Sequence, residues 1–100
     1  MPGVTISLST HVLDTGRGEP AAGVQVELFR QDELLASGVT DGDGRIGELA
    51  QGLEPGSYRL VFRPPSTFFQ RVELEIALSA GHYHVPLLVS PFSCASYRGS

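Results

Sequence analysis

The chain has 100 residues, including twelve Gly and seven Pro, a length that suits one domain over residues 1–100 with few residues to spare for the core. Its formal net charge of −4 argues against general nucleic-acid binding, which needs a basic face. No apolar run approaches the roughly 18 residues that a membrane span needs, and no secretory signal is visible. The lone Cys94 excludes an internal disulfide and fits a reducing compartment. We therefore expect a cytoplasmic protein without a membrane or nucleic-acid partner.

The N-terminal run of residues 4–13 alternates apolar and polar side chains, as a half-buried strand does. His11 falls on the polar face of this run, together with Ser7 and Ser9, opposite the apolar stripe. After a loop rich in Gly and Pro, residues 24–28 repeat the alternation. His11 is therefore expected to point away from the core.

A third strand is predicted over residues 34–40, and the Asp-Gly-Asp-Gly sequence of residues 41–44 then predicts a turn that Arg45 follows directly. The same string is similar to the start of a calcium loop. An EF-hand, however, has Gly at its sixth position and Glu at its twelfth. The chain has Ile46 and Gly52 at those positions, so we expect no calcium.

The second half of the chain contains three further alternating runs, at residues 58–63, 72–78 and 82–90. The tandem prolines after residue 63 lack backbone N–H groups and restrict the residue before them, so residues 63–70 are expected to be irregular. We find no convincing helix and no internal repeat. Seven or eight short strands in all predict an all-β sandwich of two packed sheets.

Histidines and one arginine are the candidate chemical groups. His82 and His84 share the polar face of the last run. Together with His11 they could supply three zinc ligands, but no fourth ligand is evident, and we expect no metal and no cofactor. The chain also lacks a Gly-x-Ser-x-Gly elbow and a phosphate loop. The residues alone favour a sandwich that carries a His/Arg site, with a purely structural module as the alternative.

The chain ends at Tyr97, Arg98, Gly99 and Ser100 without a polar tail. A terminal segment is usually frayed, and a solvated end after an edge strand is one interpretation. The other interpretation is that the guanidinium, the flexible Gly, the hydroxyl and the terminal carboxylate belong to a binding site.

Two resemblances correspond to these alternatives. The segments at residues 18–28, 40–44 and 53–60 resemble the carboxypeptidase-regulatory and collagen-adhesin B-type domains, which are sandwiches used as spacers and interaction modules. Other segments resemble the 5-hydroxyisourate hydrolases, the transthyretin-related enzymes of urate breakdown. This second resemblance lies at residues 8–14, 16–18, 43–45, 82–88 and 90–92, and above all in the Tyr-Arg-Gly-Ser of residues 97–100, the most specific motif.

The resemblance to the hydrolases implies a transthyretin-like (prealbumin-like) β-sandwich of two antiparallel four-stranded sheets. It implies hydrolysis of 5-hydroxyisourate to 2-oxo-4-hydroxy-4-carboxy-5-ureidoimidazoline by water attack on a lactam carbonyl. It also implies a homotetramer with its sites at the dimer–dimer interface. The matching residues are His11, Arg45 and His84 as catalytic groups, and Tyr97, Arg98, Gly99 and Ser100 as substrate-binding groups.

One departure from the family pattern concerns a helix. Family members usually carry a short helix after the strand that corresponds to residues 58–63. Here the segment at residues 63–70 is too short and too rich in proline to hold it, so we expect the helix to be missing. His82, two residues before the matched histidine, is expected to stay outside the immediate site.

Overall fold

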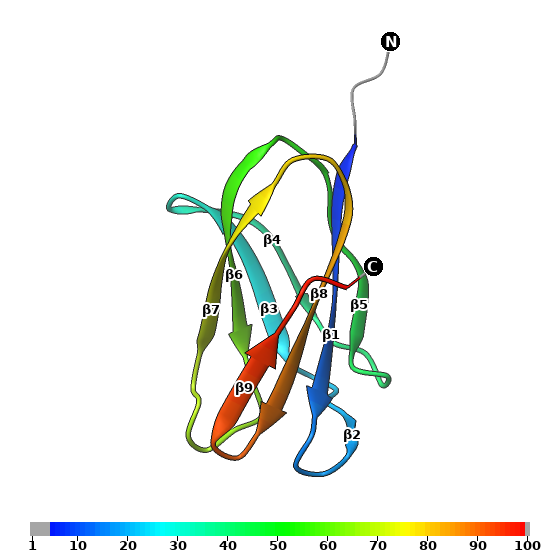
Figure 1. Ribbon diagram of the computed structural model, residues 1–100, viewed down its shortest axis with the longest axis vertical. Coiled ribbons are helices and arrows are strands. Elements are labelled where there is room, and N and C mark those ends of the chain that lie inside the picture. Colours follow the sequence, from blue (N-terminus) through cyan, green and yellow to red (C-terminus); the bar gives the residue numbers. More distant parts are fainter. Residues whose placement is uncertain (1–4, 100) are drawn as a thin grey trace.

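The computed structural model describes residues 5–99, and within this range the secondary structure is entirely β (Figure 1). The strands, in chain order, are β1 (Ile6–Asp14), β2 (Glu19–Pro20), β3 (Gln25–Arg30), β4 (Glu33–Val39), β5 (Arg45–Leu53), β6 (Gly56–Arg63), β7 (Val72–Leu78), β8 (Gly81–Ser90) and β9 (Ser93–Ser96).

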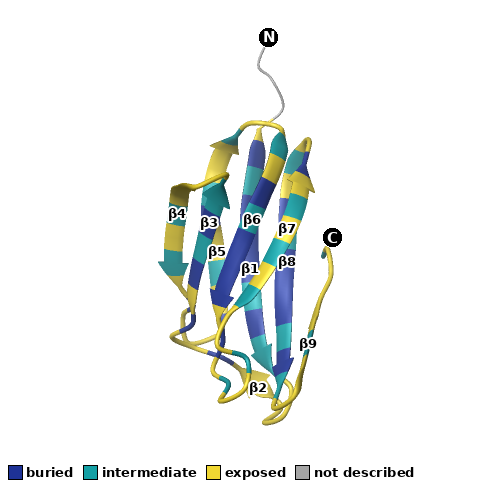
Figure 2. Cartoon of the chain, turned by 90° about the vertical axis from the view of Figure 1, so that its left-hand side faces the viewer, coloured by how far each residue is buried: buried dark blue, intermediate teal, exposed yellow. Residues whose placement is uncertain are grey.

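The strands form two sheets that enclose one hydrophobic core (Figure 2). One sheet has the order β4-β3-β6-β7 and is antiparallel throughout. In the other sheet β1 is central: β8 pairs with one side of it and carries β9 on its far edge. β5 and the short β2 share the other side of β1. The prediction of an all-β sandwich of two sheets is confirmed.

The sheet around β1 differs in two details from an antiparallel four-stranded sheet. The short β2 gives it a fifth strand. In addition, β1 and β8 run parallel, in register from Ile6 opposite Gly81 to Asp14 opposite Val89. A parallel pair needs a long crossover connection, and here the chain between the two strands builds the whole of the second sheet.

The apolar stripes of β1 and β8 fix which way their side chains point. Ile6 and Leu8 of β1 are fully buried, as are Leu60 and Phe62 on the facing sheet. Burying such a side chain stabilises the fold by about 1.5–3 kcal/mol, and a one-residue slip of a strand would expose the whole stripe. The polar faces of β1 and β8 are therefore held on the outside of the sandwich.

The segment at residues 64–71 contains neither helix nor strand, as its prolines predict. The Ser66 hydroxyl accepts hydrogen bonds from the backbone N–H groups of Phe68 and Phe69, at 3.1 and 2.9 Å. The expected loss of the short helix is confirmed. Nor does any helix able to cross a membrane occur in the described part of the chain.

Candidate active site

The outer face of β1 and β8 gathers the histidines. Parallel pairing places Ser7 opposite His82 and Ser9 opposite His84. The residues between them in sequence are buried in the core, so these four side chains point outward. His11 follows Ser9 by two residues and lies on the same face.

A tight turn brings Arg45 to this face. β5 begins at Arg45, and its register on β1 places Arg45 opposite His11. Asp41 Oδ1 accepts hydrogen bonds from the backbone N–H groups of Asp43, at 2.9 Å, and of Arg45, at 3.0 Å. The bond from Arg45, more than that from Asp43, holds the pKa of Asp41 below its ordinary value of 3.8. An ionised carboxylate therefore fixes the backbone that carries the Arg45 side chain.

Gly44 allows this turn to dock on β1. Its φ of 76° lies in the left-handed region that favours glycine. A Cβ atom at this position would lie only 2.5 Å from the carbonyl oxygen of Val12. The Gly44 carbonyl in turn accepts the Val12 N–H at 2.7 Å, so the turn is anchored to the strand that carries His11.

The same turn determines the tautomer of His11. His11 Nε2 lies 3.0 Å from the backbone carbonyl oxygen of Asp43. A carbonyl oxygen can only accept a hydrogen bond, so Nε2 carries the proton and donates it. Neutral His11 then has its lone pair on Nδ1.

His84 is partly buried, and its Nδ1 lies 2.8 Å from the Ser9 hydroxyl oxygen. Burial lowers the pKa of His84 below its ordinary value of 6.5, and the charges of His11 when protonated, of Arg45 and of His82 when protonated lower it further. At neutral pH His84 is therefore a neutral imidazole, which is the form that accepts a proton.

The end of the described chain lies along His84. Gly99 pairs with His84 in an antiparallel bridge, and its N–H donates to the His84 carbonyl oxygen at 2.6 Å. A Cβ atom on Gly99 would lie 2.9 Å from Cδ2 of the His84 ring. Glycine therefore lets the chain pass the imidazole edge without displacing it. Ser100, a predicted substrate-binding residue, lies outside the described residues.

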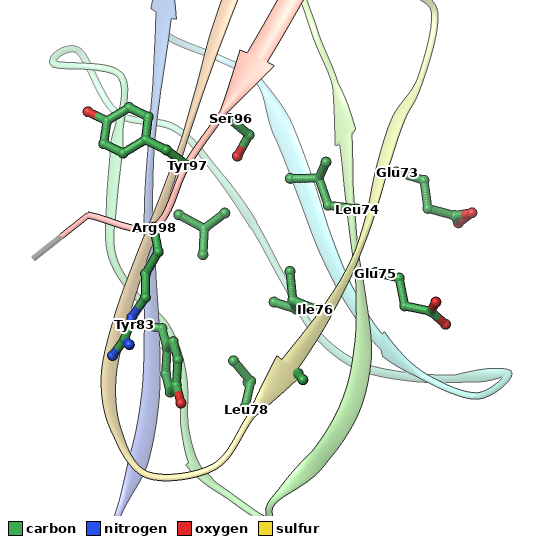
Figure 3. Close-up of a pocket in the computed structure, with 11 residues that line it drawn as sticks. Glu73, Leu74, Glu75, Ile76, Leu78, Tyr83, Ser96, Tyr97 and Arg98 are labelled. Atoms are coloured by element: carbon green, nitrogen blue, oxygen red, sulfur yellow. The ribbon is translucent and has the colours of Figure 1, made fainter.

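Arg98 points to the other face of the sheet. Its guanidinium lies 4.0 Å from the centroid of the Tyr83 ring, and one of its nitrogens lies 3.5 Å from the His82 carbonyl oxygen (Figure 3). Tyr83 faces the interior of the sandwich, away from the histidines. The neighbouring Tyr97 is exposed. The structure thus brings Gly99 to His84 and directs Arg98 away from it.

A cavity of about 460 Å³ opens beside Arg98, between β7 and the segment that follows β9 (Figure 3). It lies on the interior side of β8 and is therefore separate from the histidine face. Its apolar wall includes Leu74, Ile76, Leu78 and Val85.

The histidine face has the groups for hydrolysis by acid–base chemistry. A neutral imidazole can take a proton from water and return it to a leaving group, and a guanidinium can stabilise a developing oxyanion. Within residues 5–99, no cluster of three or more His, Cys, Asp or Glu is arranged to hold a metal ion. Fold and site together define a β-sandwich that presents the groups of an acid–base hydrolase on the outer face of one sheet.

Known proteins share this architecture. The model of the HIUase/Transthyretin family matches residues 8–99, and the chain belongs to this family. The 5-hydroxyisourate hydrolase of Pseudomonas aeruginosa is 40% identical over 114 residues, covering 93% of this chain and 90% of that protein. The solved 5-hydroxyisourate hydrolase of Klebsiella pneumoniae has a TM-score of 0.86 at 36% identity, covering 94% of this chain and 98% of that one. A solved transthyretin from Sparus aurata has a TM-score of 0.80 at 28% identity, covering 92% and 95%.

Sequence reasoning did not identify Ser9 as part of the site, and it set His82 aside. The Ser9 hydroxyl oxygen lies 2.9 Å from Nε2 of His82 as well as 2.8 Å from Nδ1 of His84. The available signal was a pair of matching spacings, Ser7 with Ser9 and His82 with His84. Their alignment depends on the register between strands 75 residues apart, which no local pattern contains.

Proposed function

We propose that this chain is a 5-hydroxyisourate hydrolase, which opens the six-membered ring of its substrate to 2-oxo-4-hydroxy-4-carboxy-5-ureidoimidazoline in urate degradation. The observation that carries the proposal is the meeting of His11, Arg45 and His84 on one sheet face. The 40% identity to a hydrolase of that name supports it. The Gly99 backbone packs closely against the His84 ring, and Arg45 lies near that ring. A non-catalytic spacer or binding module would not require this arrangement.

In this mechanism a water molecule attacks the lactam carbonyl carbon while His84 Nε2 takes one of its protons. The carbonyl electrons move to the oxygen, and the N–H donors of Arg45 stabilise the oxyanion. The tetrahedral intermediate then breaks its C–N bond, and His84 returns the proton to the leaving nitrogen. The new carboxylic acid loses its proton to solvent, so the step balances without a cofactor or a redox partner.

His11 and the chain end position the reactants in this proposal. His11 donates Nε2–H to Asp43, so its Nδ1 lone pair can accept the second proton of the water in a hydrogen bond. Gly99 lies against the His84 ring, and we propose that the chain end with Tyr97, Gly99 and Ser100 supplies groups that bind the substrate. Arg98 holds this chain end in place through its contact with Tyr83.

We further propose that the working unit is a cytoplasmic homotetramer with each site between subunits. The histidine face is an open sheet surface, and a second subunit over it would complete a pocket and exclude water. Leu13 and Leu88 lie opposite each other on this outer face and are only partly buried, which fits a covered surface.

The experiment that tests the proposal follows the ultraviolet decay of freshly generated 5-hydroxyisourate. The purified protein is expected to accelerate the decay in proportion to its concentration, above the slow spontaneous rate. Decay no faster than in buffer would refute the enzyme proposal and favour the non-catalytic module.

A further inference from the structure

The Ser9 hydroxyl lies between the imidazole rings of His82 and His84 and contacts both. Ser9 is buried, with 6% of its surface exposed, and its oxygen lies 2.8 Å from Nδ1 of His84 and 2.9 Å from Nε2 of His82. At the far side of His82, the Ser7 hydroxyl oxygen lies 2.7 Å from Nδ1. Ser7, His82, Ser9 and His84 therefore form one continuous hydrogen-bonded chain across β1 and β8.

The proton positions in this chain are coupled. A hydroxyl has one proton to donate, so Ser9 can donate to only one of the two imidazoles, and the other imidazole must donate to Ser9. In the first arrangement Ser9 donates to His84, which leaves a proton on Nε2 of His84. In the second arrangement His84 donates Nδ1–H to Ser9, Ser9 donates to His82, and His82 donates Nδ1–H to Ser7. Only the second arrangement leaves a lone pair on Nε2 of His84.

We propose that Ser9 is a positioning residue that holds His84 with its proton on Nδ1 and its lone pair on Nε2, and that His82 supports this arrangement by accepting the hydrogen bond that the Ser9 hydroxyl donates. The inference rests on the proposed function, in which Nε2 is the atom that takes the proton of water. Once His84 is protonated, the Ser9 oxygen continues to accept from Nδ1–H. The other titratable or charged groups that act on His84 from neighbouring strands are Arg45, which repels the new charge, and His11, which repels it when it is protonated. Ser9 thus offers this imidazolium a favourable contact.

Removing the hydroxyl tests the proposal. Ser9→Ala is expected to lower kcat about tenfold with KM little changed, because Ser9 touches His84 and not the substrate. Ser9→Thr keeps the hydroxyl and is expected to restore most of the rate. The matched control is Ser37→Ala on β4, where the serine is exposed on the other sheet, and it is expected to match wild type.

Nitrogen-15 NMR of the histidine rings reads the tautomer without any substrate. Neutral His84 of wild type is expected to carry its proton on Nδ1, and Ser9→Ala is expected to shift it toward Nε2. His82→Ala gives a second route that leaves Ser9 intact. Without His82 the Ser9 hydroxyl can turn to donate to His84, so the same shift toward Nε2 and a lower kcat are expected.

The possible results distinguish a failure of this inference from a failure of the proposed function. A wild-type His84 with its proton on Nε2, or a Ser9→Ala enzyme with full kcat, would overturn the inference. Failure of wild type to hydrolyse 5-hydroxyisourate would instead remove the proposed function, while the NMR measurement would still decide the tautomer. Should Ser9→Ala fail to fold, His82→Ala carries both measurements.

Discussion

The histidine that we propose as the base sits where burial and positive charge both disfavour its protonated form. Its pKa in the folded protein is below the ordinary 6.5, so the acid limb of kcat/KM is expected below pH 6.5, with a flat profile through neutral pH. Because the pKa of His84 is lower in the folded protein than in the unfolded chain, the unfolded chain binds this proton at a higher pH than the folded protein does. His84 therefore contributes stability that is present above pH 6.5 and is lost as pH falls through its lowered pKa. The pH profiles of kcat/KM and of the melting temperature check both statements, and an acid limb above pH 6.5 would contradict them.

Gly99 offers a second test at the scale of one residue. In Gly99→Ala the new methyl group would lie 2.9 Å from Cδ2 of His84, so the ring or the chain end must move. Displacing a reacting group by about 1 Å can cost roughly 10²-fold in rate, and we expect a loss of that order with little change in melting temperature. The control is Gly47→Ala on β5, where the residue is exposed and an added Cβ meets nothing within 4 Å. Equal activity of the two variants would show that the chain end does not position His84.

Among the elements, the turn at residues 41–44 connects two site residues through one carboxylate. Asp41 holds the N–H groups of Asp43 and Arg45, and the Asp43 carbonyl accepts from His11. Asp41→Ala is expected to lower the rate about tenfold, because both side chains lose a fixed backbone. Asp41→Asn keeps a carbonyl oxygen in the same place and should be closer to wild type. Initial rates of the two variants test whether the Asp41 carboxylate positions Arg45 and His11. An Asp41→Ala enzyme as active as wild type would show that it does not.

The faces of β1 and β8 could be predicted from the sequence, because their apolar stripes have one low-energy orientation, with the stripe in the core. His11 and His84 were therefore placed on outer faces correctly. β5 was not predicted, because Gly47 and Gly52 interrupt its pattern and its register on β1 shifts twice. The sequence pattern also does not predict that β1 and β8 pair in parallel. This pairing depends on contacts between the two ends of the chain, and it places the Ser9 hydroxyl next to His82 and His84.

At the scale of the whole molecule, the outer sheet face is expected to be covered in the active form. Size-exclusion chromatography with light scattering should give a tetramer for wild type. Leu88→Arg places a charge among the apolar groups of that face, so it should dissociate the assembly and abolish most activity while each chain stays folded. Circular dichroism checks the fold of the variant. A fully active monomer would contradict sites built between subunits.

The most direct measurement compares the initial rate of 5-hydroxyisourate loss for wild type with those of His11→Ala, Arg45→Ala and His84→Ala. Each replacement is expected to lower the rate by about 10²-fold or more, because it removes a proton acceptor or an oxyanion donor. The melting temperature should change little, since these side chains lie on the outer face and their loss leaves no core cavity. Wild-type rates in all three variants, or loss of activity only in parallel with unfolding, would contradict the assignment of the reaction to this face.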